Sequence, residues 1–332
     1  MGKLNQVTPA ETHATQHNAY RYAEKFFYNA FLRGSPAVEA FRQRGISVQT
    51  LRAFHAGYAP KDGQSTLRFL NRWYTNDELY TCGIASKTDN YYYSFFRDRI
   101  VVPIHDANGN TVAFGGRDME YIKGNPSPKY LNSPESTIFK KSQLLFNFNR
   151  AKTDIQRTGQ VYIVEGYMDV LSLYQAGITN VVAVMGTTLT RDHLALLSNA
   201  KHITLCFDGD KAGRDAALRA LNTMMPFLKK ELTVDFMFCP HGEDPDSVIQ
   251  KQGINAFNAL AQQAIRSTGY ALQEIAVRYP ATDAASLACR WHALKKLFQN
   301  AKPGYLRTHL LPATGSMLGL HPNSLFNMMN NS

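Results

Sequence analysis

The feature that most constrains the fold of this chain is a regular alternation of strand-like and helical runs between residues 161 and 239. The strand-like runs are VYIVEG, NVVAVMG, HITLCFDGD and VDFMFCP, and a helical pattern follows each of the first three. These runs are apolar almost throughout and rich in β-branched residues, which is typical of parallel strands buried on both faces. We therefore predict an α/β fold with a central, mainly parallel sheet.

The residues before this alternation predict a further α/β region. Apolar and aromatic residues recur at helical spacing over residues 18–32, and residues 36–54 predict two shorter helices. The runs RIVVPIH and TVAFGGR then predict two strands joined by the turn DANGN. Prolines within residues 124–135 are expected to hold the segment KYLNSP rigid. After about residue 255 only helical patterns remain.

Six acidic residues stand at the expected carboxyl ends of three strands: Glu165, Asp208, Asp210, Glu243, Asp244 and Asp246. Because the carboxyl ends of parallel strands emerge at one edge of a sheet, these side chains are expected to converge there. Crowded carboxylates repel one another and lose solvation, so a cation is expected to compensate them. Hard oxygen ligands, with no His or Cys at ligand spacing, predict Mg²⁺ or Mn²⁺ rather than zinc.

Each acid taken singly has a structural alternative. Asp208 or Asp210 could only cap a helix that begins near Ala212, and Asp246 could cap the run SVIQKQG. That alternative is weaker for acids that converge from three strands. Glycines that permit a close backbone approach lie beside them: Gly166, Gly186 and Gly209. Asp169, in a first helical turn, is interpreted as structural.

The formal charge of +10 is unevenly distributed along the chain. Residues 1–160 carry 21 Lys and Arg against 13 Asp and Glu, residues 161–250 carry 7 against 11, and residues 251–332 carry 8 against 2. An acidic region between basic ones suits an enzyme that grips a polyanion while its centre holds cations. Charge alone would fit an ordinary basic protein equally well.

Several polar side chains of the N-terminal region are candidates for contacts with nucleic acid or nucleotide phosphates. They flank a strand start, a Gly-Gly pair or the proline-rich segment, and they are Arg97, Arg99, Arg117, Lys129, Tyr130, Asn132 and Lys141. A solvated face is the alternative for any single lysine. Arg117 and Lys129 are favoured because neighbouring glycines and prolines suggest a fixed backbone close to phosphate.

Several function classes are excluded or disfavoured by what the sequence lacks. It has no signal-like run and no apolar segment of membrane-spanning length, so we expect a soluble cytoplasmic protein without membrane contact. It has no GxxxxGK[ST] motif, so it is not a P-loop ATPase. The four cysteines have no zinc-ligand spacing and are interpreted as reduced and structural: Cys82, Cys206, Cys239 and Cys289.

The motifs EGYMDV, DGDKAGRDAA and GEDPDS resemble the Toprim domain shared by bacterial primases, topoisomerases and some nucleases. Four further segments are similar to the bacterial DnaG-type primase: RGISVQTLRAFHAGYAP, FRDRIVVPIHDANGNTVAFGGR, PKYLNSPES and GTTLTRDHLALL. The resemblance runs from about residue 37 to residue 255. It implies an N-terminal α/β subdomain with a basic ridge over residues 1–154, a Toprim domain over residues 155–255 and a helical subdomain over residues 256–332.

The resemblance also implies roles for individual residues. Glu165 would be the central acid, with Asp208 and Asp210 as catalytic partners. The ligands of two or more Mg²⁺ or Mn²⁺ ions would be Glu165, Asp208, Asp210, Asp244 and Asp246. The positions similar to the family's basic ridge, which tracks template and nucleotide phosphates, are Arg44, Arg117, Lys129, Asn132 and Lys141.

The expected function is therefore that of a primase catalytic core, a nucleotidyltransferase that makes short RNA primers for replication. Its expected partners are a single-stranded DNA template, ribonucleoside triphosphates and the RNA/DNA heteroduplex product. No zinc ribbon is expected in this chain, and the family's helicase-binding domain is expected to be absent, so the replicative helicase would not bind directly. The alternatives are a Toprim nuclease, a topoisomerase, or a non-catalytic module that binds nucleic acid.

Overall fold

The computed structural model describes residues 9–34, 36–119, 127–280 and 282–330. The fold divides into two compact units, residues 1–150 and residues 151–332, and each is described by itself. The division into three parts expected from the sequence stays a prediction.

The first unit is built on a four-stranded antiparallel sheet in the order β1-β4-β5-β6. Its strands are β1 (Gly57–Ala59), β4 (Arg99–His105), β5 (Thr111–Asp118) and β6 (Tyr130–Asn132). The predicted pair of strands is confirmed as β4 and β5. Asp106 organises the turn between them, since its carboxylate accepts hydrogen bonds from the backbone N–H groups of Asn108 and Asn110, both at 2.9 Å.

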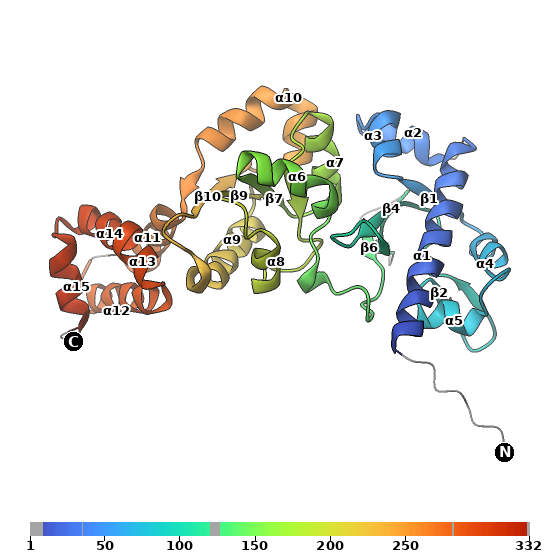
Figure 1. Ribbon diagram of the computed structural model, residues 1–332. Helices are drawn as coiled ribbons and strands as arrows, with labels where there is room; N and C mark the ends of the chain where they lie inside the picture. The colour runs from blue at the N-terminus through green and yellow to red at the C-terminus, as the bar shows by residue number, and fades with distance from the viewer. Residues whose placement is uncertain (1–8, 35, 120–126, 281, 331–332) are drawn as a thin grey trace, which may run out of the picture. The chain divides into compact units, whose positions relative to one another are not determined.

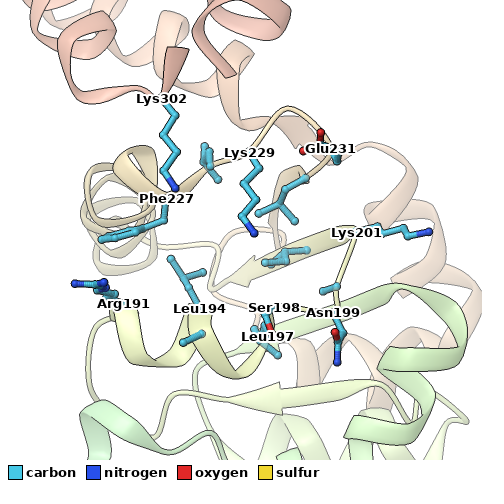
Figure 2. A pocket seen from close by; sticks show the side chains of 15 residues that line it. Arg191, Leu194, Leu197, Ser198, Asn199, Lys201, Phe227, Lys229, Glu231 and Lys302 are labelled. Carbon is cyan, nitrogen blue, oxygen red and sulfur yellow. The ribbon is translucent and has the colours of Figure 1, made fainter. Parts of the chain in front are cut away.

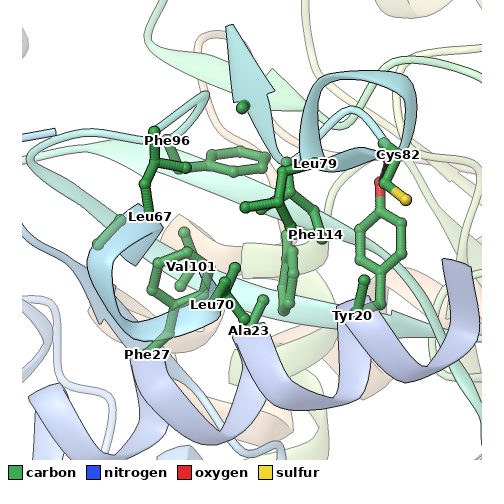
Figure 3. Close-up of a cluster of buried hydrophobic side chains, with 14 residues drawn as sticks. Tyr20, Ala23, Phe27, Leu67, Leu70, Leu79, Cys82, Phe96, Val101 and Phe114 are labelled. Carbon is green, nitrogen blue, oxygen red and sulfur yellow. Dashed lines mark hydrogen bonds between the residues drawn. The ribbon is translucent and has the colours of Figure 1, made fainter. Parts of the chain in front are cut away.

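The long helix α1 (Pro9–Leu32) packs against this sheet. Figure 3 shows the cluster between them, in which the rings of Tyr20 and Phe27 lie 5.5 and 5.2 Å from the ring of Phe114. The Tyr20 hydroxyl donates to the carbonyl of Cys82 at 2.9 Å, so the one polar atom of that ring is satisfied. A Cβ atom on Gly57 would lie 2.7 Å from Phe27, so the close approach of α1 to β1 requires glycine there.

The predicted pair of short helices is also confirmed, as α2 (Pro36–Gln43) and α3 (Val48–Ala53). The other elements of the first unit are α4 (Ser65–Leu70), α5 (Asn76–Thr81), the hairpin of β2 (Ala85–Lys87) and β3 (Tyr92–Ser94), and η1 (Lys141–Gln143). Helix α6 (Phe148–Thr158) leads along the chain into the second unit.

The proline-rich segment differs from the expected rigid loop. Its residues 124–126 lie outside the described residues, but Tyr130–Asn132 form the edge strand β6 paired with β5. The flanking Pro128 and Pro134 explain why the strand is short and lies at an edge, since proline cannot donate to a neighbouring strand.

The second unit contains the predicted sheet, in the order β11-β10-β9-β7-β8. The four parallel strands are β7 (Gln160–Val164), β8 (Val181–Ala183), β9 (His202–Phe207) and β10 (Thr233–Phe238). The helices between and after them are α7 (Tyr167–Gln175), α8 (Arg191–Leu196), α9 (Lys211–Met224) and α10 (Pro245–Gln262). In Figure 1, α7 and α10 lie on one side of this sheet and α8 and α9 on the other, so the predicted α/β fold is confirmed.

The C-terminal region is mainly helical, as expected, with one difference. Ile265–Arg266 form β11, an antiparallel edge strand on β10 in which Arg266 pairs with Asp235 at 3.2 Å. Two residues are too short to give a periodic signal in a sequence. The helical elements are η2 (Met225–Phe227), α11 (Ser267–Arg278), α12 (Ala284–Asn300), α13 (Pro303–Tyr305), η3 (Leu306–Leu310), α14 (Leu311–Leu318) and α15 (Pro322–Asn330).

All four cysteines are free, and three of them are buried, with Cys289 exposed. Burial raises the pKa of the Cys82 thiol to about 11 and that of Cys239 to about 12, which fits the structural role expected for them. Of the helices in the described part of the chain, none is both long enough and apolar enough to cross a bilayer.

Candidate active site and nucleic-acid surface

Three parallel strands deliver acidic residues to one edge of the second unit's sheet. Glu165 directly follows β7, Asp208 directly follows β9, and the turn after β10 carries Glu243 and Asp244. The predicted position of these residues at the carboxyl ends of strands is therefore observed. Their roles as catalytic residues and metal ligands remain a prediction.

The loops after β9 and β10 are in direct backbone contact. The N–H of Gly209 donates to the carbonyl of Glu243 at 3.0 Å. A Cβ atom at position 209 would lie only 1.9 Å from the carbonyl oxygen of Pro240, so no larger residue fits without moving one of the loops. Gly209 thus allows the close approach that the sequence suggested, and it fixes the acids on either side of it.

Two of the acids also cap helices. The Asp210 carboxylate accepts a hydrogen bond from the N–H of Gly213 at 2.8 Å at the start of α9, as the structural alternative required. The cap of α10 is Asp244, which accepts from the N–H of Ser247 at 2.7 Å, and not Asp246. A carboxylate has two oxygens and about four acceptor positions, so a cap does not prevent either residue from binding a cation.

Asp169, which the sequence suggested was structural, holds two of the acidic loops together. It is buried, and its carboxylate accepts hydrogen bonds from the backbone N–H groups of Gly166 and Asp246, both at 3.1 Å. The carboxylate of Asp246 in turn accepts a hydrogen bond from the Ser172 hydroxyl. The signal for this role is an aspartate inside an otherwise apolar helical turn, YMDVLSL, four residues after Glu165.

The carboxylates act on one another in two groups. Burial, and then the charge of Asp210, raise the pKa of Glu165. Burial, and then the charges of Asp244 and Asp208, hold the pKa of Asp169 well above its usual range. Both shifts have the sign of uncompensated negative charge in a partly desolvated place, so a cation bound at this edge would stabilise the ionised forms.

Whether these residues suit a divalent ion can be tested by asking which of their carboxylate oxygens already have hydrogen-bond partners. The Oε1 atom of Glu165 is buried and has no hydrogen-bond partner among the described residues. A buried anionic oxygen without a donor is costly, and a metal ion is the partner that such an oxygen lacks. The oxygen-only donors also match the preference of Mg²⁺ and Mn²⁺, so the residues fit a divalent ion.

Within residues 9–34, 36–119, 127–280 and 282–330, no three His, Cys, Asp or Glu side chains are grouped closely enough to hold a metal ion by themselves. The carboxylates can nevertheless bind a divalent ion, because Mg²⁺ typically binds through one or two carboxylates and completes its shell with water and substrate phosphate. The edge is therefore suited to an exchangeable ion whose shell is completed by water, or by phosphate when a phosphorylated ligand is bound.

A pocket of about 250 Å³ opens beside Glu165. Its apolar wall comes from β7 and β9, and its polar lining includes Thr187, Thr188 and Arg219. Arg219 lowers the pKa of Glu165, which partly offsets the effect of burial and of Asp210. The segment GTTLTRDHLALL therefore borders the acidic edge through its first residues, whereas its later residues form α8.

In the first unit, several of the predicted nucleic-acid contacts share one face of the antiparallel sheet. Arg117 pairs with Tyr130 across β5 and β6, and Asn132 pairs with Gly115 two residues along, which puts all of them on the same side. The Arg117 guanidinium donates to the Tyr130 hydroxyl at 2.6 Å, and the ammonium of exposed Lys129 lies 5.3 Å from the same ring. The ring of Tyr130 is 41% exposed, and the cationic groups of both Arg117 and Lys129 lie beside it.

The other predicted contacts are placed differently. Arg99 is 4% exposed and lies on the opposite face of the sheet, where its guanidinium donates to Ser127 at 2.7 Å and pairs with Asp118 at 3.4 Å. Arg97 is exposed and stacks over the ring of Tyr93. Arg44 lies in the turn after α2, and Lys141 begins η1, and both are half-buried. Of these four residues, Arg99 is placed by its strand register on the face opposite to Tyr130, and the binding roles of all four stay predictions.

Two family models match the chain. The model described as the DNA primase catalytic core, N-terminal domain, matches residues 26–152, and the model described as Toprim-like matches residues 162–249. A DNA primase of Legionella pneumophila is 40% identical over 247 residues, which are 73% of this chain and 41% of that protein. A DNA primase of Escherichia coli K12 is 36% identical over 305 residues, which are 90% of this chain and 52% of that protein. The chain thus spans about half the length of these curated relatives.

Solved structures are similar over nearly the whole chain. A DnaG primase catalytic domain bound to single-stranded DNA superposes with a TM-score of 0.84 at 33% identity, covering 95% of this chain and 100% of that one. A DNA primase domain from Pseudomonas aeruginosa gives a TM-score of 0.83 at 31% identity, covering 95% of this chain and 99% of that one. Toprim domains generally use divalent metal ions, in agreement with the oxygen donors described above.

Proposed function

This chain belongs to the bacterial DnaG-type primase catalytic-core family, and we propose that it makes short RNA primers on single-stranded DNA by metal-dependent nucleotidyl transfer. The proposal includes Mg²⁺ or Mn²⁺ as the cofactor, with two or more ions, and ribonucleoside triphosphates as substrates. It also places the protein in the bacterial cytoplasm, with an RNA/DNA heteroduplex as its product.

The observation that carries the proposal is the buried oxygen of Glu165, which has no hydrogen-bond partner among the residues that the structure describes, at an edge to which three strands bring carboxylates. A module that only binds nucleic acid gains nothing from carboxylates near phosphate, since they repel it. An enzyme that neutralises phosphate charge with divalent ions needs them.

When bound, the divalent ions supply charge neutralisation and orient an in-line displacement at phosphorus. The residues that would hold them fall into the two electrostatic groups, Glu165 with Asp210, and Asp208 with Asp244 and Asp246. Asp169 and Gly209 position these groups by fixing the loops that carry them. Preorganised loops need little rearrangement when substrate arrives, which lowers the barrier to reaction.

Glu165 is also suited to take the proton of the attacking 3′-hydroxyl. Its carboxylate lines the pocket at the acidic edge, so one oxygen can accept a proton from a hydroxyl placed there while the other faces a cation. Arg219, in the pocket beside it, is suited to pair with a nucleotide phosphate because its guanidinium is exposed there.

The face of Arg117, Tyr130 and Lys129 in the first unit is proposed to bind the template strand. The combination of cations with an exposed aromatic ring is typical of surfaces that grip the backbone and stack a base. The related catalytic domain was solved bound to single-stranded DNA, which supports this choice of template.

One assay separates this function from its alternatives. The chain is incubated with single-stranded DNA, the four ribonucleoside triphosphates and Mg²⁺ or Mn²⁺, and both nucleic acids are resolved on a denaturing gel. We expect short RNA that depends on metal and on template. Shortened DNA without new RNA would identify a Toprim nuclease, and bound but unchanged DNA would identify a non-catalytic module.

A further inference from the structure

A second pocket of the second unit, of about 540 Å³, takes no part in the proposed function. It is formed by α8, by the segment between α9 and β10, by residues 199–201 before β9, and by Lys302 before α13. Lys201 and Glu231 precede β9 and β10, so the pocket reaches the amino ends of these strands. The acidic residues lie at their carboxyl ends, and a ligand in the pocket would not occupy the candidate active site.

The floor of the pocket is aliphatic. Leu194, Leu197, Leu228 and Leu232 line it together with Ile203. Its one aromatic ring, Phe227, lies beside the Arg191 guanidinium at 5.6 Å. The chemistry of this floor suits bulky apolar side chains rather than bases, which need exposed aromatic faces on which to stack.

The rim of the pocket is cationic. Four basic side chains line it against one carboxylate, and all are exposed: Arg191, Lys201, Lys229 and Lys302, with Glu231. Figure 2 shows Lys229 and Lys302 extending toward the hollow above Leu194, with Arg191 at the side beside Phe227. This excess of positive charge around an apolar floor selects against neutral or basic apolar partners.

We propose that this pocket binds a short acidic peptide segment of a partner protein, with one or two bulky apolar side chains inserted between carboxylates that meet the rim. Charge complementarity favours this occupant over an uncharged one. The aliphatic floor favours it over nucleic acid, which would meet the lysines but leave the floor uncovered. The inference does not depend on primer synthesis.

The test uses fluorescently labelled eight-residue peptides that carry four aspartates and two apolar residues drawn from Leu, Ile, Phe and Trp at varied positions. Binding to the full chain is followed by fluorescence anisotropy. We expect members of this panel to bind with Kd below about 1 mM, more weakly as salt is raised, and not at all when their apolar residues are changed to Ala.

The double variant Lys229→Glu with Lys302→Glu is expected to weaken binding at least tenfold. The control is Lys295→Glu with Lys296→Glu in α12, which changes the net charge equally at residues that do not line the pocket. Circular dichroism and primer synthesis check that each variant is folded.

Three results would overturn the proposal. One is a failure of every acidic peptide to bind at millimolar concentration. Another is equal loss of binding in the two double variants, which would indicate general electrostatics. The third is single-stranded DNA that competes with the peptide and loses affinity only in the pocket variant, which would make the pocket a nucleic-acid site.

Discussion

The sheet of the first unit and the acidic edge of the second unit handle charged groups in opposite ways. In the first unit, buried charge is met by the protein itself: Arg99 pairs with Asp118, and Arg117 donates to Tyr130. At the acidic edge of the second unit, negative charge is left partly uncompensated, since Glu165 has a buried oxygen without a hydrogen-bond partner in the described part of the chain and the pKa of Asp169 is raised. Buried charge is tolerated only when it is compensated, so the second unit depends on something that it does not itself supply.

The difference teaches that the two kinds of predicted site residue call for different tests. A basic residue that is already paired within the fold contributes to structure first and to binding second. An acid without a partner contributes little to the fold, and its replacement is expected to affect chemistry more than stability.

The largest effect is expected from Glu165→Gln. This change keeps the size of the side chain but removes the charge and the base, so primer synthesis should fall by about 1,000-fold or more. Affinity for single-stranded DNA should be unchanged or slightly higher, because a negative charge near phosphate is lost. Synthesis and filter binding on the same preparations measure both. Glu231→Gln, at an exposed glutamate of the same unit, is the control, and a comparable loss in both variants would refute the assignment.

The next largest effect is expected on the pH dependence of stability in the first unit, where His105 lies beside Arg150. Burial and then the neighbouring Arg150, 3.5 Å away, lower the pKa of His105 to about 4. The unfolded chain takes up this proton near pH 6.5 and the folded chain only near pH 4, so stability is lost as pH falls between these values. The loss attributable to His105 is at most about 3 kcal/mol.

This pH dependence is measured by urea unfolding between pH 7 and pH 4. The chain has two tryptophans, and a Trp291→Phe background leaves Trp73 to report on the first unit alone. In that background His105→Gln should flatten the dependence of the free energy of unfolding on pH. Parallel curves with and without His105 would show that other groups cause the loss.

A smaller effect separates capping from metal binding at Asp210. Asparagine caps a helix nearly as well as aspartate, so Asp210→Asn should leave stability almost unchanged while the Mg²⁺ concentration for half-maximal synthesis rises about tenfold. Asp210→Ala should add a loss of about 1 kcal/mol from the missing cap. If Asp210→Asn left the metal requirement unchanged, the residue would be a cap and nothing more. Asp192→Asn, at an exposed aspartate in α8, is the control.

The smallest effect is expected on the nucleic-acid face. Lys129→Glu should weaken binding of single-stranded DNA severalfold and reduce the slope of log affinity against log salt by about 0.7 to 1, because fewer counterions are released. Lys25→Glu makes the same charge change at an exposed residue of α1 and should have little effect. An equal change of slope in the two variants would show that net charge, and not this face, sets the affinity.

Much of the fold follows from the sequence because its signals are local. Buried parallel strands such as VYIVEG and the helices between them are long enough for their periodicity to show. The edge strands β6 and β11 were missed because two or three residues carry no period, and their pairing depends on distant partners in β5 and β10.

Only part of the candidate site can be predicted from local patterns in the sequence. That Glu165, Asp208 and Asp244 stand at one edge follows from parallel topology alone. That Asp169 binds the backbone of Asp246 depends on how two segments 77 residues apart in sequence pack together, which no local pattern encodes. That Asp244 caps α10 does have a local signal, because Pro245 stands at the first helical position and Ser247 completes a capping box.

The most direct test of the central claim is to measure Mn²⁺ binding by electron paramagnetic resonance, without nucleotide or DNA. The central claim is the proposal that Glu165 is one of the ligands of a divalent cation at the acidic edge. Wild-type chain and the Glu231→Gln control should therefore bind Mn²⁺ with equal affinity, and Glu165→Gln should bind at least about tenfold more weakly while its circular dichroism is unchanged. Equal Mn²⁺ affinity in all three proteins would contradict the account, since the buried oxygen of Glu165 would then not be a metal ligand.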